Sequence, residues 1–141
     1  MLSRLIPALA LVLTLPLAPV LAQEAAPTLS LELNALQPAD GACRVTFLVT
    51  NGLAAPIETA TVEVAFFGAT GGIDRLVSLD FKALATGKTK VVQFALAGLD
   101  CGAVSRVLVN DVTACTGAGL DAAACLAALA TSSRVSAAFG V

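Results

Sequence analysis

The 141-residue chain contains no histidine, no tryptophan and no tyrosine, and its six aromatic residues are all phenylalanine. Without histidine, the chain lacks the commonest general base in enzymes and the commonest zinc ligand. Without tryptophan and tyrosine, it lacks the large amphipathic rings on which sugars stack. These absences argue against histidine-dependent catalysis, against zinc binding and against carbohydrate binding by stacking.

Other signatures of catalysis and of ligand binding are also missing from the sequence. No serine lies in a Gly-x-Ser-x-Gly turn. The glycine-rich stretches "GATGG" and "TGAG" lack the Lys-Ser/Thr ending of a phosphate-binding loop. No block of basic residues is present, and the formal net charge is −2, which argues against a nucleic-acid partner. We therefore predict a protein that is not an enzyme and that has no cofactor and no metal.

The first 22 residues have the layout of a secretory signal peptide. Arg4 gives a positive start, an apolar run extends from Leu5 to Ala22, and the small residues of Val20-Leu21-Ala22 precede Gln23. Three prolines interrupt the run, which favours cleavage over an uncleaved membrane anchor. A single arginine favours the general secretory route over the twin-arginine (Tat) route. We expect a signal peptide at 1–22, a flexible leader at 23–27 and one domain at 28–141.

The remainder of the chain alternates apolar and polar residues with the period of β-strands. Turn-forming stretches such as "QPADGA", "GATGG" and "CTGAGLD" separate the alternating segments. The stretch "DAAACLAAL" predicts a short helical turn capped by Asp121. The fold class predicted is all-β, an immunoglobulin-like antiparallel β-sandwich of about seven strands, with an antiparallel barrel as the alternative. The predicted strands are 28–36, 43–50, 61–67, 75–81, 89–96, 104–112 and 134–141.

The four cysteines predict two disulfides in an oxidising compartment. Cys101 and Cys115 stand at the ends of an apolar run that, as one strand, holds them on the order of 45 Å apart. A disulfide needs Cα atoms within about 7 Å, so each of these cysteines needs another partner. We predict Cys43–Cys101, at the starts of two strands of equal direction, and Cys115–Cys125 around a local loop. The alternative is Cys43–Cys115 with Cys101–Cys125.

A redox or metal role for the cysteines is the weaker interpretation, because no two of them have the Cys-x-x-Cys spacing. A hydrolase that uses two carboxylates in loops is the other alternative, although aspartates near turns are more often simply solvated. The candidate carboxylates are Asp74, Asp80, Asp100, Asp111 and Asp121.

The adjacent residues Phe66 and Phe67, and Arg106, are expected to affect the surface of the domain. In an alternating strand only one ring of Phe66-Phe67 can face the core, so we expect the other to be covered on the outer face or to belong to a binding patch. Arg106 interrupts an apolar strand. We expect it to pair with Asp111 or Glu63, or to protect a sheet edge.

The segments "GACRVTFLVTNG", "DRLVSLDF", "TGKTKVVQFAL", "DCGAVSRVLVNDVTAC" and "TSSR" occur in this order. In these segments the chain resembles a group of uncharacterised small exported proteins of alphaproteobacteria, some labelled Tat pathway signal sequence domain protein. It is also similar to immunoglobulin-like modules that bacteria export. The resemblance implies a non-catalytic binding or structural module, periplasmic or secreted, with another envelope protein as partner. The Tat label implies a pair of arginines in the signal peptide, whereas this chain has only Arg4 there.

Overall fold

The structure is a computed structural model that describes residues 16–22 and 25–141. Most of the predicted signal peptide (1–15) and part of the predicted leader (23–24) lie outside the described residues. Residues 16–22 and 25–28 are exposed and belong to no helix or strand. The folded part begins at Leu29.

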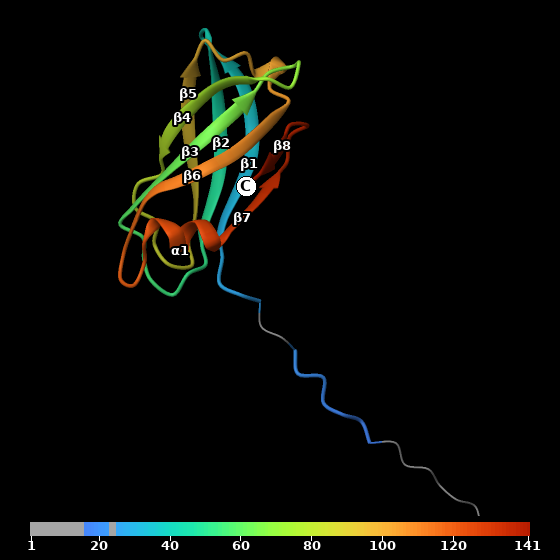
Figure 1. The fold of residues 1–141 in the computed structure, drawn as a ribbon, viewed down its shortest axis with the longest axis vertical. Helices are drawn as coiled ribbons and strands as arrows, with labels where there is room; N and C mark the ends of the chain where they lie inside the picture. The colour runs from blue at the N-terminus through green and yellow to red at the C-terminus, as the bar shows by residue number, and fades with distance from the viewer. Residues whose placement is uncertain (1–15, 23–24) are drawn as a thin grey trace, which may run out of the picture.

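The described chain forms two four-stranded sheets that pack face to face (Figure 1). In the first sheet the strand order is β5-β2-β1-β7, and in the second it is β4-β3-β6-β8. The predicted all-β sandwich is therefore confirmed, with eight strands where the sequence indicated about seven. The strands are β1 (Leu29–Ala39), β2 (Ala42–Asn51), β3 (Thr59–Phe67), β4 (Ile73–Asp80), β5 (Thr89–Ala97), β6 (Arg106–Thr116), β7 (Leu129–Ser133) and β8 (Ala138–Gly140).

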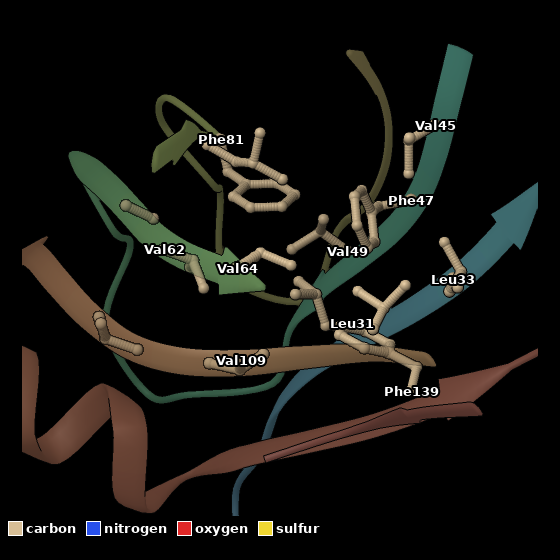
Figure 2. Close-up of a cluster of buried hydrophobic side chains, with 14 of the residues drawn as sticks. Leu31, Leu33, Val45, Phe47, Val49, Val62, Val64, Phe81, Val109 and Phe139 are labelled. Atoms are coloured by element: carbon tan, nitrogen blue, oxygen red, sulfur yellow. The ribbon is translucent and has the colours of Figure 1, made fainter. Parts of the chain in front are cut away.

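The core lies between the sheets and consists of the apolar residues at alternate strand positions (Figure 2). In β2 the inward residues from Cys43 to Val49 have no exposed surface. Phe47 occupies the centre of an aromatic cluster. Its ring centroid lies 5.6 Å from those of Phe81 and Phe139 and 6.2 Å from that of Phe94. The period-two pattern places one apolar face of each strand in this core because successive side chains point to opposite faces.

The C-terminal region differs from the prediction. The predicted strand 134–141 is only the short β8, and the preceding strand β7 was not expected. Ser133 Oγ donates to the carbonyl oxygens of Val135 and Ala137, at 3.1 and 2.7 Å, and so holds a turn where a strand was predicted. β7 pairs in parallel with β1, and β8 in parallel with β6. The segment from β7 to β8 thus passes from the first sheet to the second along one side of the sandwich.

Both predicted disulfides are present, and the alternative pairing is not. Cys43 in β2 bonds to Cys101, which begins the 3₁₀ turn η1 (Cys101–Ala103), with Cα atoms 5.2 Å apart. Cys115 in β6 bonds to Cys125 with Cα atoms 6.4 Å apart. Cys125 belongs to the helix α1 (Ala122–Ala127), whose N-terminus is capped as predicted. There Asp121 Oδ1 accepts the Ala124 N–H at 2.7 Å.

Candidate functional site

Four of the five candidate carboxylates have local partners. Asp121 caps α1, and Asp100 accepts the N–H of Gly102 at 3.0 Å. Asp74 forms an ion pair with Arg75, which adjoins it in the chain, at 2.8 Å. These contacts tie the three side chains to turns and strand ends. The structure does not bring the five candidate carboxylates into one cluster.

The carboxylate of Asp80 is bound twice by Lys82. Its Oδ2 accepts a hydrogen bond from Lys82 Nζ at 2.7 Å, and its Oδ1 accepts the Lys82 backbone N–H at 2.8 Å. The side-chain hydrogen bond, followed by the backbone one, lowers the pKa of Asp80 below its ordinary value of 3.8. The two hydrogen bonds between Asp80 and Lys82 stabilise the turn after β4, where Lys82 has a φ of 62°.

Replacing Asp80 with asparagine is expected to make stability less sensitive to acid. A carboxylate with a lowered folded-state pKa contributes stability above its unfolded pKa and loses it as the pH falls through the folded pKa. The wild type should therefore be the more stable protein at pH 6, and its advantage should shrink as the pH falls from 6 through the lowered pKa of Asp80. Urea midpoints of both proteins across this range measure the effect. A constant difference across the range would contradict it.

A hollow of about 390 Å³ lies at the end of the sandwich, beside the Cys43–Cys101 disulfide. It is lined by residues 38–42 and 98–101, and Asp40 and Asp100 both contribute to its wall. Within residues 16–22 and 25–141, no group of three or more metal-ligating side chains converges. All four cysteines are in disulfides, so none offers a thiol to the redox role left open by the sequence.

The outer face of the second sheet carries a continuous row of apolar side chains. Ala65 of β3 pairs with Leu76 of β4 on one side and with Leu108 of β6 on the other. Ala65 is 2% exposed yet lies outside the inner core cluster, so its neighbours on the outer face cover it. Leu76 is 50% exposed. The small Ala65 side chain therefore forms the floor between two larger apolar residues.

A second row lies beside the first. Phe67 pairs with Ile73 on β4 and with Arg106 on β6, which in turn pairs with Ala138. Ile73 is 65% exposed. We call the two rows together the apolar outer face. Its members are Ala65, Phe67, Ile73, Leu76, Leu108 and Ala138.

The predicted roles of Arg106, an ion pair or protection of a sheet edge, are wrong. Arg106 forms no ion pair with Asp111 or Glu63 among the described residues, and it does not guard an edge, because β6 lies between β3 and β8. The strand begins at Arg106 rather than two residues earlier, so the residue stands at its end and points outward. Its guanidinium carbon lies 5.1 Å from the ring centroid of Phe67, a cation–π contact. Glu63 instead accepts a hydrogen bond from Asn110.

Phe66 and Phe67 follow the prediction for adjacent rings. Phe66 is fully buried in the core, and Phe67 is half-buried on the outer face, covered in part by Arg106. The adjacent phenylalanines alone predict an outward ring, but they do not predict its neighbours Leu76, Leu108 and Ile73. Apolar residues at the outward positions of three alternating segments were the available signal. Only the strand register shows that they adjoin.

The outer face of the first sheet is mostly polar, although it carries the apolar cross-strand pair Leu48–Val91, of which Val91 is 62% exposed. Thr50 and Thr89 share a hydrogen bond of 2.7 Å, and the side-chain amide of Gln93 donates to Thr46 Oγ1 at 3.1 Å. Ser30 is the cross-strand neighbour of Thr50. The two outer faces of the sandwich therefore differ in chemistry.

No helix in the described part of the chain is long and apolar enough to cross a membrane. The two disulfides fit a compartment in which such bonds persist. Comparison of the chain with protein-family models, curated proteins and solved structures finds no match.

Proposed function

We propose that this protein is an exported, non-catalytic module that binds another envelope protein through the apolar outer face. The observation that carries the proposal is the pair of apolar rows on the second sheet, with Ile73 and Leu76 at least half exposed. Contiguous exposed apolar surface on a folded domain usually marks an interaction site.

The composition of this surface supports a protein partner. Protein interfaces are enriched in aromatic residues and arginine, and their centres are poor in other charges. Phe67 and Arg106 lie at one end of the apolar outer face and hold each other in place by the cation–π contact. On the outer face of the first sheet, the apolar pair Leu48–Val91 lies between two hydrogen-bonded polar pairs and does not extend into a row.

Export rests on two independent features. Residues 1–22 have the arrangement of a cleavable signal peptide. The chain also contains two disulfides, which persist in oxidising compartments outside the cytosol. Both features favour a periplasmic or secreted location reached by the general secretory route. The resemblance to small exported alphaproteobacterial proteins agrees with this location.

Cross-linking in the cells that export the protein tests the proposal. A photoreactive amino acid at Leu76 is expected to form a covalent adduct of defined mass with one envelope protein, identified by mass spectrometry. The same amino acid at Ser132, an exposed residue on the outer face of the first sheet, is the matched control. Adducts that form equally at both positions, or at neither, would contradict the proposal.

Once the partner is identified, Leu76→Asp is expected to weaken its binding by about tenfold or more, because a charge would then be buried at the interface without a counter-ion. The control Ser132→Asp should leave the dissociation constant within about twofold. Titration calorimetry measures both values. A Leu76→Asp protein that binds as tightly as the wild type would place the interface elsewhere.

A further inference from the structure

The two sheets of the described chain end on four edge strands, and β5 differs from the other three. β7 has five residues and β8 has three, which makes both poor templates for another strand. β4 carries Asp74, Arg75 and Asp80, and its pairing with β3 contains a register shift. β5 has nine residues, contains no proline and pairs with β2 without any shift. Long, regular edges of this kind are templates for pairing with another chain.

β4 and β5 are the edge strands on one side of the sandwich, and the short strands β7 and β8 are the edge strands on the other side (Figure 1). The inward residues of β5, Val92, Phe94 and Leu96, are only half-buried. Their counterparts in β2, such as Phe47, are completely buried. The apolar interior is therefore incompletely covered along β5.

Two charged side chains at the ends of β5 donate hydrogen bonds to the protein's own backbone. Lys90 Nζ donates to the carbonyl oxygens of Phe81 and Ala83, each at 3.2 Å. Arg75 Nη1 donates to the carbonyl oxygen of Ala97 at 2.7 Å. Between these two anchored ends, residues 91–96 contain no charged side chain. The usual protection of an edge by an outward lysine is absent from this stretch.

We infer that β5 pairs in antiparallel fashion with β5 of a second copy of this chain, so that the two first sheets form one continuous sheet. The edge is self-complementary. Pairing about a two-fold axis at Gln93 places Val91 opposite Ala95 and Lys90 opposite Leu96. The two lysines then lie about 20 Å apart along the strands, so no like charges meet. An isologous contact of this kind closes as a dimer.

A second copy fits this edge better than a charged peptide does, because residues 91–96 offer such a peptide no counter-charge. The added strand would also cover the half-buried side chains of Val92, Phe94 and Leu96. This dimer uses an edge of the first sheet, while the proposed partner surface lies on the outer face of the second. The two can therefore be tested separately.

Sedimentation velocity of the oxidised protein from about 1 μM to about 1 mM tests the inference. The wild type is expected to shift from monomer to dimer over this range. Gln93→Lys places two lysines opposite each other at the axis and should weaken the dimer by about tenfold. Val91→Lys is a second variant that should also weaken the dimer. Val91 is 62% exposed, and its replacement leaves the Gln93–Thr46 hydrogen bond intact. Ser78→Lys adds the same charge to the exposed outer side of β4 and should dimerise like the wild type.

Thermal midpoints show whether each variant is folded. A wild type that stays monomeric up to the highest concentration would overturn the inference. So would folded Gln93→Lys and Val91→Lys proteins that dimerise as tightly as the wild type. A dimer that only Ser78→Lys weakens would also overturn it, because the contact would then involve β4 and not β5.

Discussion

Replacing Phe47 with alanine is expected to lower the free energy of unfolding by about 3–5 kcal/mol. The side chain is completely buried and contacts three other rings, from Phe81, Phe94 and Phe139. These rings come from different parts of the chain and from both sheets, so a cavity at Phe47 removes contacts that hold the sheets together (Figure 2). Urea denaturation of the oxidised protein measures the loss.

The matched control for this prediction is Phe67→Ala, the same substitution on the outer face. Phe67 is half-buried, and its covering contact is the exposed Arg106 side chain. Its loss should cost about 1 kcal/mol, because less surface returns to water and no closed cavity forms. If the two substitutions cost the same, Phe47 would not be the centre of the core.

Alternation in the sequence was sufficient to predict the central strands. In the segment from Cys43 to Val49, every second residue is apolar and every one of these is fully buried. The physical reason is that strand side chains alternate between faces, so a half-buried strand reveals its inner face in its composition. The same argument correctly assigned Val62, Val64 and Phe66 in β3.

The C-terminal strands were harder to predict because their own residues carry little preference. β7 reads Leu-Ala-Thr-Ser-Ser, without a strong alternation, and it follows an alanine-rich helix. What makes it a strand is the free edge of β1, with which it pairs from Leu29 to Leu33. A contact between segments about a hundred residues apart leaves no local signal.

The candidate site was predicted only in part, for a related reason. The sequence indicated that one ring of Phe66-Phe67 faces outward, but the row it belongs to depends on cross-strand register. β3 pairs with β6 through two register shifts, and these decide that Ala65 adjoins Leu108 and that Phe67 adjoins Arg106. Register shifts of this kind cannot be read from any one strand. Arg106 was therefore assigned the wrong partners.

Removing the Cys43–Cys101 disulfide by replacing both residues with alanine is expected to lower the free energy of unfolding by about 4 kcal/mol. The bond joins residues 58 positions apart, and in the chain-entropy model a longer closed loop restricts the unfolded chain more strongly. A domain of this size is stable by only about 5–15 kcal/mol, so this loss removes a large part of its stability. Urea denaturation without reductant measures the loss.

The second disulfide is the control, because it closes a loop between residues only 10 positions apart. Replacing Cys115 and Cys125 with alanine should cost about 2.5 kcal/mol, roughly 1.5 kcal/mol less than the loss of the first bond. The order of the two losses tests the argument more strictly than either value. If the local disulfide proved the more important, restriction of the unfolded chain would not be the main contribution. If the order holds, the protein depends most on the bond between β2 and η1, and it reaches full stability only where that bond can form.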